Sequence, residues 1–305
     1  MQHYRSLDEL TLQDSWVTVG VFDGVHRGHQ QVLQKLTAGA RANGVPAVVL
    51  TFDPHPAKLF GRGEIKLLTL PGERARLLGD QGVDVVITHP FDRNVANISA
   101  FDFMKRLKDR LGLSHLMLGY DSTLGKNREG DATRLTEIGR ELGYTVETVT
   151  ALSDESGVIS STEIRKLISV GNIAEAERLM GHSYRLQGLV THGDHRGRTI
   201  GYPTANLNYA REKIIPAGGI YACWAFVQSE RFAAAVNIGT NPTFTPDKQT
   251  LNVEAYLLDF DRDIYDEELR LEFVARLRDE LKFDSVEALI EQIGQDVQDT
   301  RQILT

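Results

Sequence analysis

The stretch GVFDGVHRGH, residues 20–29, decides how this sequence of 305 residues folds. It follows the short apolar run at residues 17–21 and precedes a segment in which apolar residues recur at helical spacing. The spaced residues are Val32, Leu33, Leu36 and Ala40. A strand, a glycine-rich turn and a helix in this order predict the first βα unit of a parallel sheet. In such a sheet the turn lies at the edge where ligands bind.

The turn contains groups that suit a phosphate. Gly24 and Gly28 let the backbone approach a ligand closely, and the helix begins with free N–H groups and the positive end of its dipole. His26 and His29 are three residues apart, so on the first helical turn they share a side and can donate hydrogen bonds to phosphate oxygens. A purely structural turn and half of a zinc site are the alternatives, although no further ligand stands nearby at suitable spacing.

The rest of the first half alternates between strand-like and helix-like segments. Strands are predicted at residues 45–52, 83–88, 115–119 and 145–149. Helix starts are expected at Pro71, two residues after Thr69, and at Ser99. This alternation predicts a Rossmann-like α/β domain with a parallel sheet and right-handed crossovers.

After residue 150 the pattern changes. Two short helical segments are followed by short β-like runs at residues 184–190, 219–227, 232–238 and 252–260. Several short strands separated by glycine- and proline-rich turns predict a small antiparallel barrel or sandwich. The spacing of Val274, Leu277 and Leu281, and of a second set from Val286 to Ile293, predicts C-terminal helices. We place the boundary at Gly181, which gives domains of residues 1–181 and 182–305.

Charge and composition limit the class of protein. The net charge of −8 argues against general binding to nucleic acid or to an anionic membrane, but a phosphate substrate needs only local donors. No apolar run approaches the ~20 residues that span a bilayer, and the polar N-terminus does not resemble a secretion signal. The single cysteine, Cys223, cannot form an internal disulfide, so we expect a cytoplasmic protein. The sequence predicts nothing about oligomeric state.

Two other segments of the first half are candidates to join the turn. TFDPHP, residues 51–56, ends the second predicted strand and carries His55 to the same sheet edge. ISSTEIR, residues 159–165, precedes and enters a helical run, and its polar residues can bind phosphate as an N-cap cluster with a nearby guanidinium. These residues are Ser160, Ser161, Thr162 and Arg165. The alternatives are a rigid strand exit made by two prolines and a plain capping box.

A second candidate site follows the predicted strand at residues 184–190. Its glycine-rich backbone and arginines suit a flap over nucleotide phosphates, although a simple hairpin turn is an equal alternative. The residues are Gly193, Arg196, Gly197, Arg198, Gly201 and Pro203. Thr204 and Asn206 offer hard oxygen ligands of the kind that hold Mg²⁺ together with phosphate. The acidic run at residues 259–268 is expected to be a solvated turn.

The three motifs of the first half resemble, in order, the signatures of bacterial FAD synthetases. These enzymes belong to a nucleotidyltransferase superfamily whose HxGH turn holds the phosphates of ATP. The resemblance implies that His26 and His29 contact these phosphates and stabilise adenylyl transfer. It also implies ATP-binding roles for Gly20, Phe22, Asp23, Gly24, Gly28, His55, Ser160, Ser161, Thr162 and Arg165.

One loop departs from that family pattern. Residues 119–130, GYDSTLGKNREG, have Ser122 and Leu124 where the family pattern GxDFxFG has aromatic residues. The loop leaves the fourth predicted strand, where the resemblance places the flavin. Its candidate flavin-binding residues, which are equally interpretable as a solvated loop, are Asp121, Lys126, Asn127 and Arg128.

The second half resembles riboflavin kinases. HGDHRGRTIGYPTAN, residues 192–206, is similar to their signature, and NVEAYLLDF, residues 252–260, is similar to their VExHxxDF strand. The resemblance implies that Glu254 is the general base on the ribityl 5′-hydroxyl, and its alternation with apolar neighbours would let it project from the opposite face of a strand. It further implies substrate-side positions for Asn237, Arg276 and Phe283.

Together the resemblances imply a bifunctional riboflavin kinase/FAD synthetase. The C-terminal domain would convert riboflavin and ATP to FMN, and the N-terminal domain would convert FMN and ATP to FAD and pyrophosphate, with Mg²⁺ at both sites. The departing loop leaves open two alternatives. In one the N-terminal domain is a binding or regulatory module, and in the other it adenylylates another phosphate ester.

Overall fold

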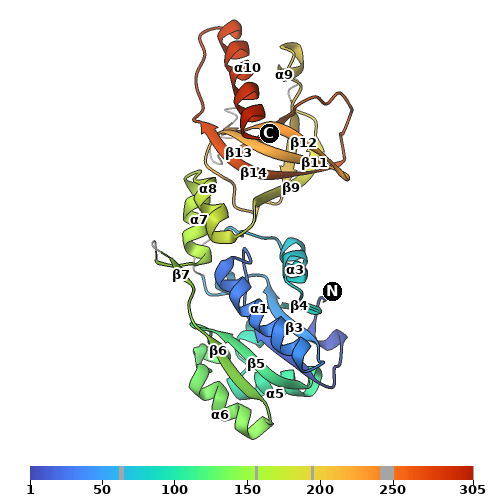
Figure 1. Ribbon diagram of the computed structural model, residues 1–305, viewed down its shortest axis with the longest axis vertical. Coiled ribbons are helices and arrows are strands. Elements are labelled where there is room, and N and C mark those ends of the chain that lie inside the picture. The colour runs from blue at the N-terminus through green and yellow to red at the C-terminus, as the bar shows by residue number, and fades with distance from the viewer. Residues whose placement is uncertain (62–64, 155–156, 194–195, 241–250, 305) are drawn as a thin grey trace. The chain divides into compact units, whose positions relative to one another are not determined.

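The computed structural model describes residues 1–61, 65–154, 157–193, 196–240 and 251–304 (Figure 1). The chain divides into two compact units, Met1–Ser161 and Thr162–Thr305, which we call the first and second units. None of the helices in the described ranges is both long and apolar enough to cross a bilayer.

The first unit is built on a six-stranded parallel sheet with the order β1-β4-β3-β2-β5-β6 (Figure 1). The strands are β1 (Gln2–Tyr4), β2 (Ser15–Val19), β3 (Ala47–Asp53), β4 (Val85–Pro90), β5 (Leu113–Gly119) and β6 (Thr145–Val149). The main helices are α1 (Arg27–Ala42), α3 (Pro71–Asp80), α5 (Ala100–Leu111) and α6 (Ala132–Leu142), with the short α2 (Pro56–Leu59) and α4 (Arg93–Ala96). The predicted Rossmann-like domain is confirmed. The strand order reverses between β2 and β5, so the segments that follow these two strands flank the switch point where α/β sheets bind ligands.

Helices cover both faces of this sheet. β3 is buried from Ala47 to Phe52, which is typical of a central parallel strand. Its side chains alternate between two cores: Val49 packs in the cluster that contains Leu33 of α1, and Leu50 in the cluster that contains Leu107 of α5. The edge strand β1 was not predicted, because three residues of mixed character carry no periodic signal.

Helix starts follow the predicted capping chemistry. The Ser99 hydroxyl accepts a hydrogen bond from the Asp102 backbone N–H at 3.1 Å at the start of α5. Pro71 occupies the first turn of α3, and the Glu73 carboxylate accepts from the Leu70 backbone N–H at 2.8 Å. Both predicted starts are therefore confirmed.

The second unit is a closed antiparallel barrel with the strand order β10-β13-β12-β11-β14-β9. The strands are β9 (Tyr184–Thr191), β10 (Ala205–Tyr209), β11 (Gly219–Val227), β12 (Glu230–Thr240), β13 (Leu251–Leu257) and β14 (Glu268–Arg278). The helices of this unit are α7 (Ser161–Ser169), whose first residue still belongs to the first unit, α8 (Ile173–Met180), α9 (Arg196–Thr199) and α10 (Val286–Ile303). The predicted small barrel is confirmed. α8 packs against β9 and β14. The domain boundary that we placed at Gly181 stays a prediction.

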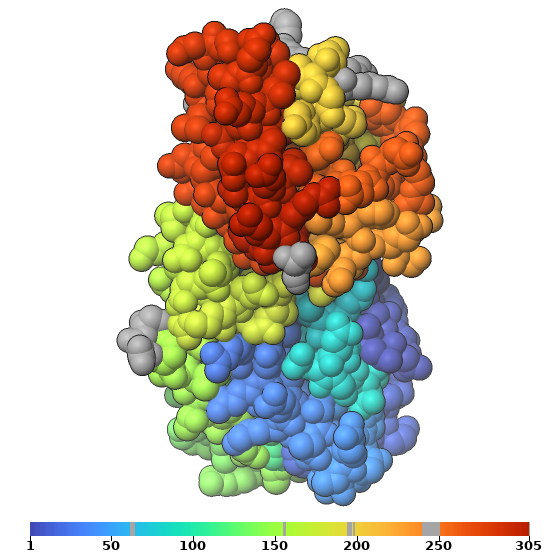
Figure 2. All heavy atoms as spheres, turned by 45° about the horizontal axis from the view of Figure 1, so that its top comes forward, coloured from blue at the N-terminus to red at the C-terminus, as the bar shows by residue number. Residues whose placement is uncertain are grey.

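The first of the predicted C-terminal helices was wrong. Residues 268–278 form β14, in which buried Leu269, Leu271 and Phe273 alternate with less buried residues. This period of two belongs to a barrel strand, and the helical spacing of Val274 and Leu277 is coincidental. The second predicted helix is confirmed as α10, which packs against β11, β12 and β14 and lies on the surface of its unit (red in Figure 2).

Candidate functional sites

The turn between β2 and α1 has an unusual backbone. Phe22 (φ 51°), Gly24 (φ 83°) and Val25 (φ 39°) all adopt positive φ angles, which cost a residue with a side chain some conformational energy. Space is tight at Gly28, because a Cβ atom there would lie 3.2 Å from the His26 ring. A turn that holds such a conformation must be fixed by its surroundings.

Asp23 provides that fixation. Its carboxylate is buried and accepts hydrogen bonds from the backbone N–H groups of Leu68 (3.1 Å) and Thr69 (2.9 Å) and from the Thr69 hydroxyl (3.1 Å). The Gly24 backbone N–H donates to the Thr69 hydroxyl at 3.0 Å, and the Ser161 hydroxyl donates to the Asp23 carbonyl at 2.8 Å. Asp23, which the resemblance made an ATP-binding residue, thus uses its carboxylate oxygens to clamp the turn onto the segment before α3.

The two histidines of the turn lie face to face. Their ring centroids are 3.6 Å apart, and the His26 Nδ1 accepts a hydrogen bond from the His29 backbone N–H at 3.4 Å as the N-cap of α1. Burial holds the pKa of His29 well below its ordinary value, and the charges of His26 and Arg74 lower it further. The His29 Nδ1 is buried without a hydrogen-bond partner. The pair therefore offers ring N–H donors at a helix N-terminus, the arrangement that suits an anionic phosphate.

The motifs at residues 51–56 and 159–165 were also expected near the turn between β2 and α1. His55 follows β3, the neighbour of β2, and its Nδ1 accepts from the Ala57 backbone N–H at 3.1 Å. Gly20 is tied to β3 by a hydrogen bond from its N–H to the Leu50 carbonyl at 3.1 Å. Ser161 contacts Asp23, and Ser160 precedes it directly. Thr162 and Arg165 belong to the second unit, so their role at the turn stays a prediction.

The loop after β5 is anchored without the family's aromatic residues. Leu124 is only 8% exposed, packs in the core beneath α5 and α6, and pairs with Gly130 through two backbone hydrogen bonds of 2.9 Å. The structure thus shows that leucine fills the buried position. The polar candidates on this loop, which starts beside β2 at the carboxyl edge, are all exposed: Asp121, Lys126, Asn127 and Arg128.

In the second unit the barrel register gathers polar side chains. Glu254 on β13 lies directly opposite Asn206 on β10 and opposite Asn237 on β12. Its neighbours Val253 and Ala255 are buried in the barrel, so Glu254 is on the outer face, as predicted. The row Asn206–Glu254–Asn237 therefore crosses three adjacent strands. The Asn237 Oδ1 is buried and has no hydrogen-bond partner.

The segment before β10 completes this group. The Thr204 hydroxyl donates a hydrogen bond to the Glu254 Oε2 at 3.4 Å. Two glycines allow the preceding loop to approach closely, since a Cβ at Gly193 would lie 2.2 Å from the Asn206 amide and one at Gly197 would lie 2.3 Å from the Tyr202 carbonyl. Thr204 and Asn206 thus share one site with Glu254, which lies about 50 residues further along the chain.

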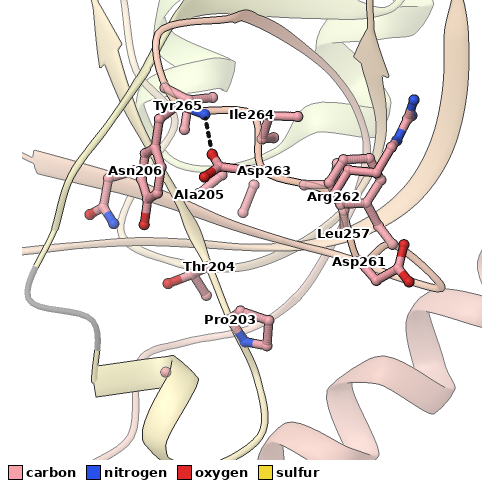
Figure 3. Close-up of a pocket in the computed structure, with 14 residues that line it drawn as sticks. Pro203, Thr204, Ala205, Asn206, Leu257, Asp261, Arg262, Asp263, Ile264 and Tyr265 are labelled. Atoms are coloured by element: carbon pink, nitrogen blue, oxygen red, sulfur yellow. Dashed lines mark hydrogen bonds between the residues drawn. The ribbon is translucent and has the colours of Figure 1, made fainter.

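A cavity of about 430 Å³ adjoins Thr204 and Asn206. Figure 3 shows Pro203 and Thr204 across this cavity from Asp263 and Ile264. Part of the wall is apolar, and Asp261, Arg262 and Asp263 make another part polar. Its volume and mixed lining are typical of a site for a small organic ligand.

Some predicted kinase residues are not brought to Glu254. Arg276 lies on β14, which β11 and β12 separate from β13, and it pairs with Asp279 at 2.6 Å and donates to the Gly218 carbonyl. Phe283 is half-buried in the connection before α10. Gly201 (φ 86°) turns the chain into Pro203. The side chains of Arg196 and Arg198 lie outside the described parts of the structure.

Two features escaped the sequence analysis. The acidic run at residues 259–268, which we expected to be only a solvated turn, contributes residues 261–265 to the cavity wall. Apolar Ile264 and aromatic Tyr265 inside the acidic run were the available signal. The second feature is Arg74, which falls on the buried side of α3 with Ala75, Leu77 and Leu78. A charged residue at a core position of an amphipathic helix was a signal that we did not use.

Comparison with known proteins also divides the chain into two parts. Family models for FAD synthetase and for riboflavin kinase match residues 8–163 and 180–304. A Listeria monocytogenes protein, a bifunctional riboflavin kinase/FMN adenylyltransferase, is 39% identical over 99% of this chain and 96% of its own. An Escherichia coli protein of the same description is 38% identical over 96% of this chain and 93% of its own. A solved structure from Streptococcus pneumoniae, described as a macrolide-efflux protein, has a TM-score of 0.89 and 34% identity over 98% of both chains.

Proposed function

Because the chain belongs to the family of bifunctional riboflavin kinase/FMN adenylyltransferases, we propose that it makes FMN and FAD at two separate sites. The second unit transfers the γ-phosphoryl group of ATP to riboflavin. The first unit transfers the adenylyl group of a second ATP to FMN.

The kinase proposal is carried by the position of Glu254 between Asn206 and Asn237, with the Thr204 hydroxyl 3.4 Å from its carboxylate. In this reaction Glu254 accepts the proton of the ribityl 5′-hydroxyl. The 5′-oxygen then forms a bond to the γ-phosphorus of ATP through the electron pair that the proton has left. The bond between the γ-phosphorus and the β–γ bridging oxygen breaks, and ADP leaves. The hydrogen bond from Thr204 orients the carboxylate before substrate arrives.

The same group suits Mg²⁺. Thr204 and Asn206 bring a hydroxyl and a carboxamide oxygen beside the Glu254 carboxylate, and hard oxygen donors are what this ion prefers. Thr204 and Asn206 would hold the ion together with ATP phosphate oxygens, and when bound it would neutralise charge on the transferred phosphoryl group. Within the described ranges no group of three histidine, cysteine or acidic side chains is arranged to hold a metal ion by itself, and we propose that ATP phosphate oxygens supply the further ligands.

The cavity beside Thr204 is our proposed ATP pocket of the kinase. Its apolar part, which includes Leu257 and Ile264, suits a nucleobase. Its edge at Thr204 and Asn206 would place the phosphates near Glu254. Gly193 lies close to Asn206 and Gly197 lies close to Thr204, as the backbone of a phosphate-binding flap would need to do.

In the first unit, the N-terminus of α1 and the paired histidines would hold the ATP phosphates. An oxygen of the FMN phosphate bonds to the α-phosphorus of ATP, the α–β bridging bond breaks, and pyrophosphate leaves from the turn. His26 and His29 would donate hydrogen bonds to the leaving phosphates as negative charge develops there. The loop after β5 lies beside β2 at the sheet edge, which supports it as the flavin side of the site.

Product analysis tests both halves. The purified chain is incubated with ATP, Mg²⁺ and either riboflavin or FMN, and the flavins are separated by HPLC. We expect riboflavin to give FMN and then FAD, and FMN to give FAD with one pyrophosphate for each FAD. FMN that accumulates and never becomes FAD would contradict the adenylyltransferase and favour a regulatory first unit.

A further inference from the structure

A buried guanidinium lies in the first unit, close to the proposed adenylyltransferase turn. Arg74 is only 1% exposed and belongs to the first helical turn of α3. It follows, by a few residues, the segment of Leu68 and Thr69 that clamps Asp23. Arginine is almost never fully buried unless a partner neutralises it, so its position calls for an explanation.

The contacts of Arg74 leave its charge largely uncompensated. Its Nη2 donates to the Phe52 carbonyl at 2.9 Å, and its Nε is buried without an acceptor. No described carboxylate comes within 4.0 Å of it to form an ion pair. Asp23 and Asp53 attract the charge from a longer range and raise the pKa of Arg74, but burial lowers that pKa more strongly. A buried cation in this condition is costly for the empty protein.

The position of this cation relates it to the site in two ways. Phe52 is the residue before Asp53 on β3, so the hydrogen bond to its carbonyl fixes the strand end that leads to His55. The positive charge of Arg74 also lowers the pKa of His29, so the guanidinium acts electrostatically on the paired histidines. Arg74 thus affects two segments at the proposed site. It bonds to the end of β3 through the Phe52 carbonyl, and its charge acts on His29 in the helix that follows β2.

We propose that Arg74 is a positioning residue of the FMN adenylyltransferase site, a buried cation whose charge is compensated when the polyphosphate of ATP, or product pyrophosphate, binds at the turn. The proposal rests on the proposed function of the first unit. A helix N-terminus supplies only about half an elementary charge, whereas a polyphosphate brings several negative charges. Arg74 adds a full positive charge that acts on the turn region, and its hydrogen bond to the Phe52 carbonyl holds the end of β3.

Two substitutions separate charge from bulk. Arg74→Met keeps most of the volume and removes the charge, and Arg74→Lys keeps the charge. Arg76→Met is the matched control, because Arg76 is exposed on the same helix. For each variant, the KM for ATP and the inhibition by inorganic pyrophosphate are measured in FAD formation from FMN. The KM for ATP in FMN formation from riboflavin, which the second unit catalyses, is the internal control.

We expect Arg74→Met to raise the KM for ATP in FAD formation at least tenfold and to weaken pyrophosphate inhibition by a similar factor. Arg74→Lys should stay within about threefold of the parent protein, and Arg76→Met and all FMN formation should be unchanged. An Arg74→Met variant with parental KM and pyrophosphate inhibition would overturn the proposal. So would equal losses in kcat alone for Met and Lys variants, because that pattern indicates a packing role.

If Arg74→Met does not fold, Arg74→Lys decides alone: a KM for ATP near that of the parent supports the proposal, and a tenfold increase contradicts it. A failure of this proposal can be told apart from a failure of the proposed function. If the proposed function is wrong, the unsubstituted chain itself makes no FAD from FMN.

Discussion

The two proposed sites are built in opposite ways. In the first unit, one short stretch of chain makes a turn and a helix start, and a hydrogen-bond network of Asp23, Thr69 and Ser161 holds it. In the second unit, Thr204, Glu254 and Asn237 come from three places in the chain and meet through the barrel register. The first site presents mainly backbone N–H groups and imidazole donors, whereas the second presents side-chain oxygens.

This difference follows from the two chemistries. Holding polyphosphate and letting pyrophosphate leave requires positive potential and donors, which a helix N-terminus supplies. Phosphorylation of an alcohol requires a proton acceptor beside the hydroxyl and oxygen ligands for a metal ion, which a row of side chains across strands supplies. Substitutions should therefore separate the two activities, and the following predictions run from the largest expected effect to the smallest.

The sharpest separation should come from Glu254→Gln. The amide cannot accept the proton of the 5′-hydroxyl, so FMN formation should fall by about 10²–10⁴-fold, and FAD formation from supplied FMN should be unchanged. Both rates are read by HPLC. Glu268→Gln, an exposed carboxylate on β14, is the control and should leave both rates intact. Equal loss of both activities in Glu254→Gln would contradict two separate sites.

The reverse separation should come from His29→Ala. Loss of an imidazole donor at the start of α1 should slow FAD formation from FMN by about 10²-fold, while FMN formation keeps its rate. His115→Ala is the matched control, because His115 lies near the beginning of β5, away from the carboxyl edge of the sheet. A His29→Ala enzyme with the parental rate of FAD formation would remove the histidine pair from the mechanism.

A smaller effect is expected from Thr204→Val. This change removes one proposed metal ligand and the hydrogen bond that orients Glu254, but it retains the base. FMN formation should fall by about tenfold, and the Mg²⁺ concentration for half-maximal rate should rise. A magnesium titration at saturating ATP measures both. A lower rate with an unchanged magnesium requirement would mean that Thr204 only orients Glu254.

The smallest effect concerns pH and stability in the first unit. Burial is the main cause that lowers the pKa values of four histidines there, namely His3, His29, His89 and His115. Below pH 6.5 the unfolded chain therefore binds protons that the folded unit resists, so the free energy of unfolding is greatest above pH 6.5 and falls as the pH drops. We expect about 1 kcal/mol from His29 between pH 7.5 and pH 5.5.

Calorimetric unfolding at a series of pH values measures this slope. His29→Gln should flatten it, because the variant has no imidazole to protonate at that position. An unchanged slope in the variant would show that the burial of His29 does not affect stability. The carboxylates with lowered pKa, Asp8 and Asp92, do not interfere, since they titrate in a lower pH range around and below their ordinary value of 3.8.

Local chemistry explains which parts of the fold were predictable. The strand at residues 145–149 and the helix starts at Pro71 and Ser99 were predicted correctly, because apolar periodicity and capping are properties of neighbouring residues. β14 was mistaken for a helix because its residues fit both periods, and only closure of the barrel on β9 and β11 selects the strand. The three-residue β1 has no periodic signal and forms by pairing with β4.

The sequence by itself determined the two-domain organisation, the turn at residues 20–29 and the identity of the chemical groups. The tertiary structure decided which groups meet. Thr204 and Glu254 are 50 positions apart and come together only because β10 pairs with β13. The hydrogen bonds of the Asp23 carboxylate to Thr69, and the burial of Arg74 with its bond to the Phe52 carbonyl, also depend on packing between distant segments. Motifs record short-range geometry, whereas charge compensation in a protein interior is a property of the folded chain.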